Sequence, residues 1–566
     1  MRTQLFSITL ILGAVSLISS CGGGDINIAP STVDNSTDNS STTTGTTTAV
    51  NPCASYVNSG GQTIEAAFNG TDCTYTPSFV DAGNNLTVDM TIPALENDGV
   101  HIFQGSLFVG ETHDTDAALA AAGIVEGGDG PVLTIEAGAT LAFTANSDFF
   151  IVNRGSQIFA VGTETSPITF TSVSDIESAR EATPTLEFDA VQQWGGMVIN
   201  GFGVTNKCDY TGSVAGGDLA TTDCHVDAEG AAGLDESQYG GDNNSDSSGR
   251  MEYVRVKHTG AQVANGDELN GISFGGVGSN TIVNNLEVYS TFDDGIEMFG
   301  GAVNFNNFVA LYVRDDAIDI DEGYSGTITN ALVIQAEDDG NHCIESDGIG
   351  SFSSLTSTEV EAVISQGINS RPTISNLTCI ISPNGGGTHG NGAGWRLREG
   401  IFPKISDSIV IAAFGNDDAA AENYCLRIDN RSQQAAQDGD LDLDSIIFSC
   451  ADRTNGGSLP DATTVEEFAT ATGNQFATTL ANDDPTATAN TALVLLEGTP
   501  AIYSVDFATM IVDGASPTAA APQSGGAFIG ALSLGAPDWT ANWTYGIHSG
   551  ARSVDADGVD VPLWFE

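Results

Sequence analysis

Basic residues are scarce in this sequence. Among 566 residues, 16 are Lys or Arg and 74 are Asp or Glu, so the formal charge is −58 at pH 7. Binding to nucleic acid needs clustered Lys and Arg that contact phosphates, so we expect no nucleic-acid partner. No apolar run of about 18 residues follows the first twenty positions, so we expect no membrane-spanning helix.

Cysteine motifs typical of zinc sites are also missing. The sequence has seven His and no Cys-x-x-Cys, which argues against zinc. Apart from Cys21, the cysteines form an even set of eight, as expected in an oxidising compartment. Pairing each with its nearest neighbour is one of 105 possible connectivities. The candidate pairs are then Cys53 with Cys73, Cys208 with Cys224, Cys343 with Cys379, and Cys425 with Cys450.

The first 21 residues have the features of an export signal. Arg2 precedes an apolar run from Leu5 to Ile18. The segment Leu17-Ile18-Ser19-Ser20-Cys21 resembles the lipobox of bacterial lipoproteins, which implies that Cys21 carries a lipid and becomes the mature N-terminus. By the same resemblance, Gly22 implies the outer membrane. The alternative is an ordinary soluble signal with a chance cysteine.

A repeat built on paired aspartates indicates a coil of β-strands. Three segments share this pattern and start 22 and 23 residues apart: Asp293-Asp294-Gly295-Ile296-Glu297, Asp315-Asp316-Ala317-Ile318-Asp319 and Asp338-Asp339-Gly340. A short apolar run lies before each segment, and the runs follow Asn285, Asn307 and Asn330. Strand and turn at a fixed period are typical of solenoids, and the alternating pattern excludes helical ones. We therefore predict an all-β fold, a parallel β-helix.

Several stretches extend this pattern along the chain. They are Leu133 to Ser172, Gln193 to Ile199, the Asp-Asp segments, and Asp538-Trp539-Thr540 with Trp543-Thr544. Together they resemble secreted bacterial proteins of the pectin-lyase-like superfamily over about residues 90 to 566, which implies a right-handed parallel β-helix. The resemblance implies no single activity, because this fold hosts lyases, hydrolases, adhesins and receptors.

The sequence also predicts how the chain is divided. We expect a signal at 1–21, a Ser/Thr-rich flexible tether at 22–52, an N-terminal β-rich cap at 53–130, the β-helix at 131–460, and a helix-containing insertion with a closing β segment at 461–566. Insertions are expected near 203–248, pinned by a disulfide, and near 350–371. Glu466 and Glu467 next to helically spaced apolar residues predict a short helix on the flank of the coil.

Carboxylates are expected to stack on the outside of the coil. Alternate strand residues face opposite sides, so Ile320 should point inward and Asp321 outward. Stacking at about 4.8 Å per turn then makes neighbouring carboxylates repel by about 3.5 kcal/mol at an effective dielectric of 20. A bound cation, raised pKa values or side chains that splay into water would offset this repulsion. Ca²⁺ suits such a set of oxygens, and the alternative to a Ca²⁺ site is that these side chains cap turn amides. The candidate Ca²⁺ ligands are Asp293, Glu297, Asp315, Asp319, Asp321, Asp338 and Glu345.

Basic residues cluster only after this acidic region. Arg396, Arg398, Lys404, Arg427 and Arg431 fall within 36 positions. If Leu397 aligns with Ile344, Arg396 and Arg398 project outward, and the column changes from acidic to basic. One interpretation is an ion pair of Arg398 with Glu345, worth roughly 0–1 kcal/mol at a surface. The other is an arginine that binds a uronate carboxylate or abstracts a proton.

Two enzymatic hypotheses follow from these residues. Polygalacturonase-like hydrolases carry Asn-Thr-Asp, Asp-Asp, Gly-His-Gly and Arg-Ile-Lys in that order. Similar segments occur here as Phe292-Asp293-Asp294, Arg314-Asp315-Asp316, Asn341-His342-Cys343 and Arg396-Leu397-Arg398. The resemblance implies that Asp294, Asp315, Asp316 and His342 are catalytic and that Arg398 holds the substrate. The other hypothesis is a Ca²⁺-assisted polysaccharide lyase with Arg396 or Arg398 as the base.

A third hypothesis involves no catalysis, and the sequence favours it. A lipid anchor, a tether and large insertions suit a binding or adhesion module that faces the cell surface or the periplasm. Its ligand would be a glycan or an outer-membrane protein, bound along the outer face of a coil that Ca²⁺ stabilises.

Overall fold

The computed structural model of the protein describes eleven ranges of the chain. They are 51–81, 83–181, 184–229, 237–264, 267–382, 387–412, 424–450, 452–476, 528–532, 536–555 and 558–564. The expected signal at 1–21, with Cys21, and nearly all of the tether at 22–52 lie outside these ranges. Within them, no helix combines the length and the apolar character that a bilayer crossing requires. The fold described below belongs to the unit Asn51–Glu566.

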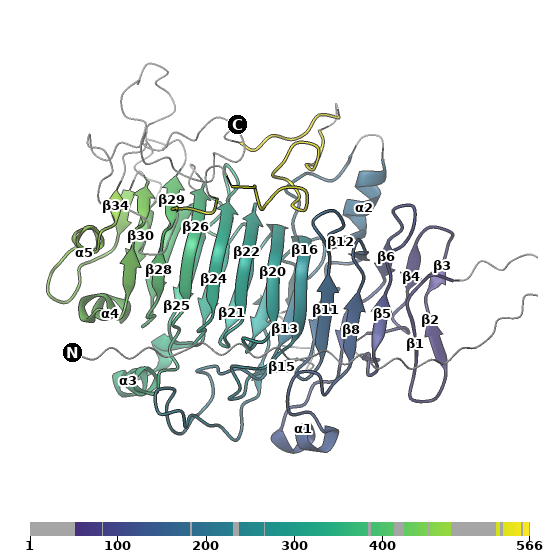
Figure 1. The fold of residues 1–566 in the computed structure, drawn as a ribbon, viewed down its shortest axis with the longest axis horizontal. Helices are drawn as coiled ribbons and strands as arrows, with labels where there is room; N and C mark the ends of the chain where they lie inside the picture. The colour runs from purple at the N-terminus through teal and green to yellow at the C-terminus, as the bar shows by residue number, and fades with distance from the viewer. Residues whose placement is uncertain are drawn as a thin grey trace, which may run out of the picture. The chain divides into compact units, whose positions relative to one another are not determined.

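One wall of the coil is a ten-stranded sheet in which all neighbours run parallel (Figure 1). Its strands are β7 (Leu107–Val109), β10 (Phe150–Val152), β13 (Met197–Asn200), β19 (Ile272–Gly275), β21 (Ile296–Phe299), β23 (Ile318–Asp321), β25 (His342–Asp347), β27 (Ala393–Arg398), β30 (Tyr424–Ile428) and β33 (Asp452–Asn455). Each strand pairs with the next one in this series, so every turn of the coil adds one strand.

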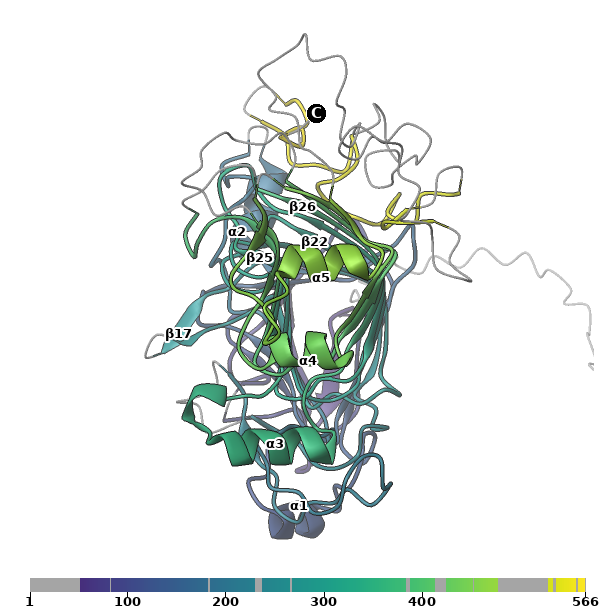
Figure 2. The same cartoon turned by 90° about the vertical axis from the view of Figure 1, so that its left-hand side faces the viewer.

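A second, bent sheet supplies the rest of the coil. Its strands are β3 (Ala67–Phe68), β4 (Cys73–Tyr75), β5 (Met90–Ile92), β6 (His101–Phe103), β8 (Val132–Ile135), β9 (Thr140–Phe143), β11 (Gln157–Val161), β12 (Ile168–Ser172), β16 (Gly249–Thr259), β20 (Ile282–Thr291), β22 (Asn304–Leu311), β24 (Thr327–Ile334), β26 (Thr373–Ile381), β28 (Lys404–Ser406), β29 (Ile409–Ala412), β31 (Asp442–Asp444), β32 (Ile447–Ser449) and β34 (Gln475–Phe476). The long strand β16 pairs with both β11 and β12. In the next turn of the coil, one bent strand therefore takes the place of two short strands. Figure 2 shows these strands edge on, with α4 and α5 at the near end.

The bend of each long strand falls at a residue in the left-handed region of backbone conformation. Tyr253, Asn285, Asn307, Asn330 and Asn376 take φ values between 52° and 61°. Asn enters this region more readily than most residues, because its short polar side chain can bond locally. The Asn330 amide donates to Asn307 Oδ1 at 3.2 Å, which links successive corners. The asparagines that precede the apolar runs in the sequence therefore form a corner of the coil.

Smaller elements flank the two sheets. The antiparallel pairs are β1 (Ser55–Val57) with β2 (Thr63–Glu65), β14 (Val226–Asp227) with β15 (Gln238–Tyr239), and β17 (Gln262–Ala264) with β18 (Asp267–Glu268). The helices are α1 (Asp116–Ala122), α2 (Val173–Arg180), the 3₁₀ turn η1 (Phe352–Ser354), α3 (Ser357–Gln366), α4 (Ser432–Asp438) and α5 (Val465–Ala471). Helix α5 is the predicted short helix, and Thr464 and Glu467 close its first turn as a capping box.

The parallel coil starts earlier than the sequence indicated. Strands β4, β5 and β6 already pair in parallel with strands of later turns. The boundary expected at residue 131, between a cap and the β-helix, therefore lies inside the coil. Short early strands separated by Gly and Pro hid the period in this region.

Apolar side chains fill the inside of the coil and also cover part of its outside. Ile318 and Ile320 are fully buried, while Asp319 and Asp321 on the opposite side are half-buried. A second apolar cluster lies on the outer side of the bent sheet, where Leu311 and Leu332 pack with Trp543 and Ile547 from the C-terminal segment. That segment, residues 528–564 where described, therefore acts as a cover for part of the outer surface.

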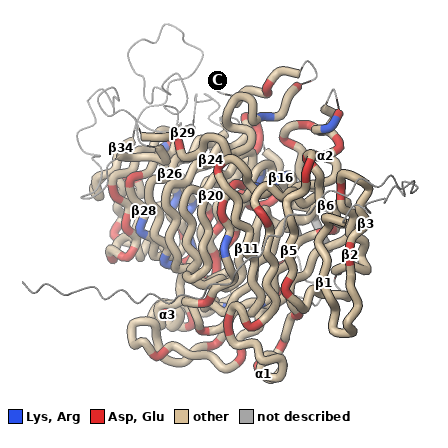
Figure 3. The backbone as a smooth tube through the Cα atoms, turned by 45° about the vertical axis from the view of Figure 1, so that its right-hand side comes forward, with Lys and Arg blue, Asp and Glu red and all other residues tan. Residues whose placement is uncertain are grey.

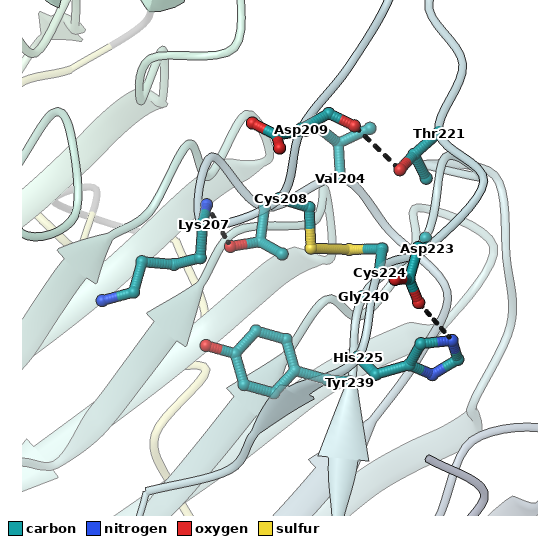
Figure 4. Close-up of a disulfide and its surroundings, with 12 residues drawn as sticks. Val204, Lys207, Cys208, Asp209, Thr221, Asp223, Cys224, His225, Tyr239 and Gly240 are labelled. Carbon is teal, nitrogen blue, oxygen red and sulfur yellow. Dashed lines mark hydrogen bonds and ion pairs between the residues drawn. A yellow bond between two sulfur atoms is a disulfide. The ribbon is translucent and has the colours of Figure 1, made fainter. Parts of the chain in front are cut away.

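Disulfides link strands of the coil and close a loop within one insertion. All four expected pairs are present: Cys53–Cys73, Cys208–Cys224, Cys343–Cys379 and Cys425–Cys450. Figure 4 shows Cys208–Cys224 in the insertion at 203–248, with Asp223 and His225 beside it. The predicted right-handed parallel β-helix with disulfide-pinned insertions and a flanking helix is confirmed.

Candidate functional site

The ten-stranded sheet aligns charged residues into a column on its outer side. The register pairs Glu297 with Asp319, Asp319 with Glu345, Glu345 with Arg396, and Arg396 with Arg427. The predicted change from acidic to basic therefore takes place between β25 and β27. Figure 3 shows how few Lys and Arg residues the chain has for its many Asp and Glu residues.

The alignment of β25 with β27 differs from the one expected. Ile344 pairs with Trp395, whereas the sequence suggested Leu397, and Leu397 pairs with Ser346. The difference is two residues, so the inward and outward sides are unchanged and Arg396 still projects outward. The insertions between β25 and β27 remove the fixed spacing by which this register could be read from the sequence.

Carboxylates also gather in the turns before these strands. Asp294 Oδ1 accepts the backbone N–H of Asp316 at 3.0 Å, and Asp316 Oδ1 accepts the backbone N–H of His342 at 2.6 Å. Each aspartate thus caps the turn one rung further on, as the turn-capping interpretation expected. Because a carboxylate has two oxygens, each of these residues keeps an oxygen for another contact.

Three carboxylates from two rungs form a compact cluster, which we call the acidic cluster: Asp294, Glu297 and Asp319. One oxygen from each lies within 4.8 Å of the others. Burial raises the pKa of all three above the usual range, and neighbouring carboxylates raise them further. Among the described residues, no Lys or Arg forms an ion pair with any of the three.

Two buried oxygens at this cluster lack a hydrogen-bond partner among the described residues. They are Asp319 Oδ1 and Asn270 Oδ1. The Asn270 amide nitrogen donates to Glu297 Oε2 at 2.6 Å and to Glu229 Oε2 at 3.2 Å. Glu229 belongs to the disulfide-pinned insertion, so this insertion brings a further carboxylate to the acidic cluster.

A second group joins Asp293 and Asp315 to His389. Ligand atoms of these residues lie within 4.8 Å of one another, and His389 Nδ1 is 2.7 Å from Asp315 Oδ2. The sequence gave no indication of His389, because it lies in an insertion between β26 and β27 that follows no repeat. Asp321 accepts the N–H of Glu322 at 2.6 Å, and Asp338 is exposed. Neither joins a cluster of possible ligands among the described residues.

The basic end of the column is neutralised by acidic partners. Arg398 Nη2 lies 2.8 Å from Glu345 Oε2, and the Arg398 guanidinium also bonds to Asp347. Arg396 Nη1 lies 2.9 Å from Glu345 Oε1. The expected ion pair of Arg398 with Glu345 is therefore present. Burial lowers the pKa of Arg398, but the hydrogen bond to Asp347 and the charge of Glu345 outweigh it, so the pKa is raised overall. A raised pKa opposes a role for Arg398 as a base.

A cavity of about 320 Å³ opens at this basic end. It is lined by Asn341, His342, Gly390, Asn391, Ala393, Arg396, Tyr424 and Arg427. His342 Nδ1 is 2.8 Å from Asp316 Oδ1, and His342 Nε2 is 2.8 Å from the Tyr424 hydroxyl. Asp316, His342 and Tyr424 therefore form a buried chain of hydrogen bonds that ends at the cavity. The sequence analysis missed Tyr424, because it followed the aspartate pairs only as far as Asp338-Asp339.

Comparison with known proteins assigns the fold but no activity. The model of the pectate-lyase-like β-helix domain family matches residues 111–499. Among solved structures, the crystal structure of Dettilon tailspike protein (gp208) matches with 12% identity and a TM-score of 0.15, over 59% of this chain and 66% of the tailspike chain. The chain thus spans just under two thirds of that protein. No curated protein matches the sequence.

Proposed function

This chain belongs to the pectate-lyase-like β-helix family, and from that premise we propose that it binds an acidic polysaccharide on the outer side of the ten-stranded sheet. Ca²⁺ held by the acidic cluster would stabilise that surface and bridge it to the carboxylates of the glycan. We propose further that Cys21 is lipidated and holds the protein at the outer membrane. A protein of that membrane is the alternative partner.

The acidic cluster is the observation that carries this proposal. Ligand oxygens of Asp294, Glu297 and Asp319 lie within 4.8 Å of one another. Two ionised carboxylates at about 4.8 Å repel by about 3.5 kcal/mol if the effective dielectric is 20. The described residues supply no ion-paired cation to offset this repulsion for Asp294, Glu297 or Asp319. A divalent cation would offset it for all three residues at once.

The donor set fits Ca²⁺ better than other common cations. Ca²⁺ takes six to eight oxygens and accepts irregular geometry. The cluster offers three carboxylates, and the partnerless oxygens of Asp319 and Asn270 lie beside them. Glu345, a ligand candidate in the sequence, is better explained by its bonds to Arg396 and Arg398. The proposed ligand set is therefore Asp294, Glu297 and Asp319, with oxygens of the glycan completing the coordination.

The arginines next to the cluster favour a ligand with carboxylates. Arg396 and Arg427 line the cavity, two rungs and three rungs beyond Asp319 in the same column. Arginine pairs well with carboxylate because its planar fork matches the two oxygens. A uronic-acid chain laid along the column would meet the cation at one end and the arginines at the other.

Hydrolysis with inversion is less well supported by the same residues. Inverting enzymes separate their two carboxyl groups by roughly 6.5–9.5 Å to admit a water molecule. Here oxygens of Asp294, Asp315 and Asp316 approach within 4.8 Å, and two of these residues already accept backbone N–H groups. Binding of a glycan without cleavage does not require two carboxyl groups at this separation.

Calorimetry with Ca²⁺ and the full chain tests the cation site. We expect saturable binding and a rise in melting temperature of several degrees, since a ligand that binds only the folded state stabilises it. The double variant Glu297→Gln with Asp319→Asn should lose both effects. Asp338→Asn is the matched control, because Asp338 is exposed outside the cluster, and it should bind Ca²⁺ as the wild type does.

Retention on immobilised sugars then tests the ligand. The wild type should be retained on polygalacturonate or alginate in Ca²⁺, released by a chelator, and not retained on neutral dextran. Equal retention on dextran, or retention that ignores both the chelator and the double variant, would refute the proposal.

A further inference from the structure

We propose that a cavity between α1 and the disulfide-pinned insertion binds a small organic amine, which carries a positive charge on an apolar body. The cavity has a volume of about 280 Å³ and is lined partly by the loops that follow β10 and β13. None of the acidic-cluster residues Asp294, Glu297 and Asp319 lines it. This cavity is therefore separate from the proposed glycan surface, and its ligand does not depend on that proposal.

Apolar groups form one part of the cavity wall. Leu119 comes from α1, Ile124 and Val125 from the segment after this helix, and Phe202 from the loop after β13. Val125 is 73% exposed, the largest fraction for any large hydrophobic side chain in the described ranges. A ligand with an apolar body would cover part of this wall and remove it from water. The volume lies just below the roughly 300–1,000 Å³ of drug-sized ligand sites, so the ligand should be small.

Carboxylates form another part of the same wall. Asp116, Asp223 and Asp242 line the cavity, and Arg154 is the single Lys or Arg among the described residues that line it. Three negative charges and one positive charge leave a net charge of −2. The side chains of Asp116 and Asp223 are 59% and 86% exposed, so a charged group that enters from solvent can reach both. The charge of the wall favours a cation.

Arg154 gives an anion no foothold in the cavity, because its donors are used within the protein. The residue is 4% exposed. Through Nη1 it donates to the carbonyl oxygens of Cys224 and Gly240, at 2.9 and 2.8 Å. Through Nη2 it donates to the carbonyl oxygen of His113 and to Nδ1 of His225, at 2.8 and 2.7 Å. These bonds use all four N–H groups of the two terminal nitrogens.

The same bonds favour an ammonium group over a metal ion. Because Arg154 can only donate, we assign His225 Nδ1 as an acceptor, and the neutral ring then carries its proton on Nε2. Nε2 lies 3.0 Å from Asp116 Oδ1 and 3.6 Å from Asp223 Oδ1, and Figure 4 shows His225 beside Asp223. A proton therefore faces the two carboxylates, so the imidazole cannot join them as a metal ligand. An ammonium group needs acceptors alone, which the carboxylates supply.

Calorimetric titration of the full chain with 2-phenylethylamine tests the proposal. Two matched probes separate its parts: 2-phenylethanol keeps the ring and lacks the charge, and methylammonium keeps the charge and lacks the ring. We expect the amine to bind at least about ten-fold tighter than either probe, since each exposed ion pair contributes up to roughly five-fold in affinity and the ring adds apolar burial. Absence of saturable binding, or equal affinity for the amine and either probe, would overturn the proposal.

Variants then locate the site. The double variant Asp116→Asn with Asp223→Asn should weaken binding of the amine at least about ten-fold and leave the affinity for 2-phenylethanol unchanged. Ala120→Phe should abolish binding of both compounds, because Ala120 is an exposed residue of α1 that lines the cavity and the larger ring would fill it.

Asp209→Asn is the matched control, because it removes a carboxylate from the same insertion at a residue that does not line the cavity. The backbone oxygen of Asp209, and not its side chain, accepts the Thr221 hydroxyl, so this bond survives the change. The control should bind the amine as the wild type does. A loss in Asp209→Asn equal to that in the double variant, or full binding by Ala120→Phe, would show that the amine responds only to the overall negative charge and would overturn the proposal.

Discussion

Glu287 lies fully buried on β20, where the C-terminal segment crosses the bent sheet. Its Oε2 accepts the N–H of Tyr545 at 2.8 Å, and the nearest guanidinium nitrogen, Arg255 Nε, is 4.0 Å away. Burial raises the pKa of Glu287 to about 8, although Arg255, the Tyr545 amide and Lys257 oppose this shift. The carboxyl group is therefore mostly neutral at pH 7 and holds the segment as an uncharged acceptor.

This pKa predicts how stability depends on pH. A carboxyl group with a folded pKa of about 8 and an unfolded pKa near 4.3 binds its proton more tightly in the folded state. The stability that protonated Glu287 contributes is fully present below its unfolded pKa. This stability is lost as the pH rises through the folded pKa of about 8. We expect Glu287→Gln, which cannot ionise, to gain a few kcal/mol of stability relative to the wild type between pH 6 and pH 9.

Denaturant unfolding of both proteins at pH 6, 7.5 and 9 measures this difference. Because the acidic cluster also has raised pKa values, only the difference between the two proteins reports on Glu287. Parallel pH profiles would show that Glu287 is charged in the folded state.

Individual site residues were predictable where the repeat continues. Glu297 and Asp319 were candidate Ca²⁺ ligands and Asp294 a candidate catalytic residue, because the Asp-Asp pattern indicates both their turn and their side of the strand. The structure brings the three together in the acidic cluster. Tyr424 and His389 were not, since each follows an insertion of irregular length. A side chain after such an insertion has no register in the sequence, and only the folded coil shows what it contacts.

At the scale of single elements, the corner residues bend the strands. Asn307 takes φ 61° in the middle of β22, and its Oδ1 accepts the amide of Asn330. A residue with a Cβ and no local hydrogen bond costs roughly 1–2 kcal/mol in this region, whereas Gly enters it freely. The corner therefore selects Asn or Gly for conformational reasons, and not for function.

The prediction is that Asn307→Ala destabilises the protein by about 1–2 kcal/mol and Asn307→Gly by less. Asn306 supplies the control, because it is the exposed neighbour on the same strand and its φ is not positive. Asn306→Ala should change the unfolding free energy by no more than about 0.5 kcal/mol. Thermal or denaturant unfolding measures all three variants, and equal losses for Asn307→Ala and Asn306→Ala would contradict the conformational explanation.

The same elements show how far a repeat predicts structure. The spacing of Asn285, Asn307 and Asn330 showed the period of the coil in the sequence, and the structure places these residues at one corner. The register of β25 with β27 was misjudged by two residues, because residues 350–371 and the segment around His389 lie between the strands. The spacing of a repeat can be read from the sequence. The register of two strands separated by an insertion cannot, because it depends on how their side chains pack.

At the scale of the whole molecule, the β-helix was predictable and its outer cover was not. Leu311 and Leu332 point away from the core, yet they are buried by Trp543 and Ile547. In the sequence, such strands are apolar on both sides, which indicates that both sides are buried. The pattern does not indicate which segment covers the outer side. The C-terminal segment has no strand period that would have placed it there.

The proposed lipid anchor at Cys21 leads to a prediction for the full chain in a bacterial host. If Cys21 is lipidated, the wild type should incorporate a labelled fatty acid and fractionate with the outer membrane. Cys21→Ser should lose the label and leave the outer-membrane fraction, because the acyl groups would supply the affinity for that membrane. Ser40→Ala, in the expected tether, is the control and should remain with the membrane. A labelled band in Cys21→Ser, or an unlabelled wild type, would mean that the leader is an ordinary export signal. The proposed glycan-binding face would then belong to a freely diffusing protein.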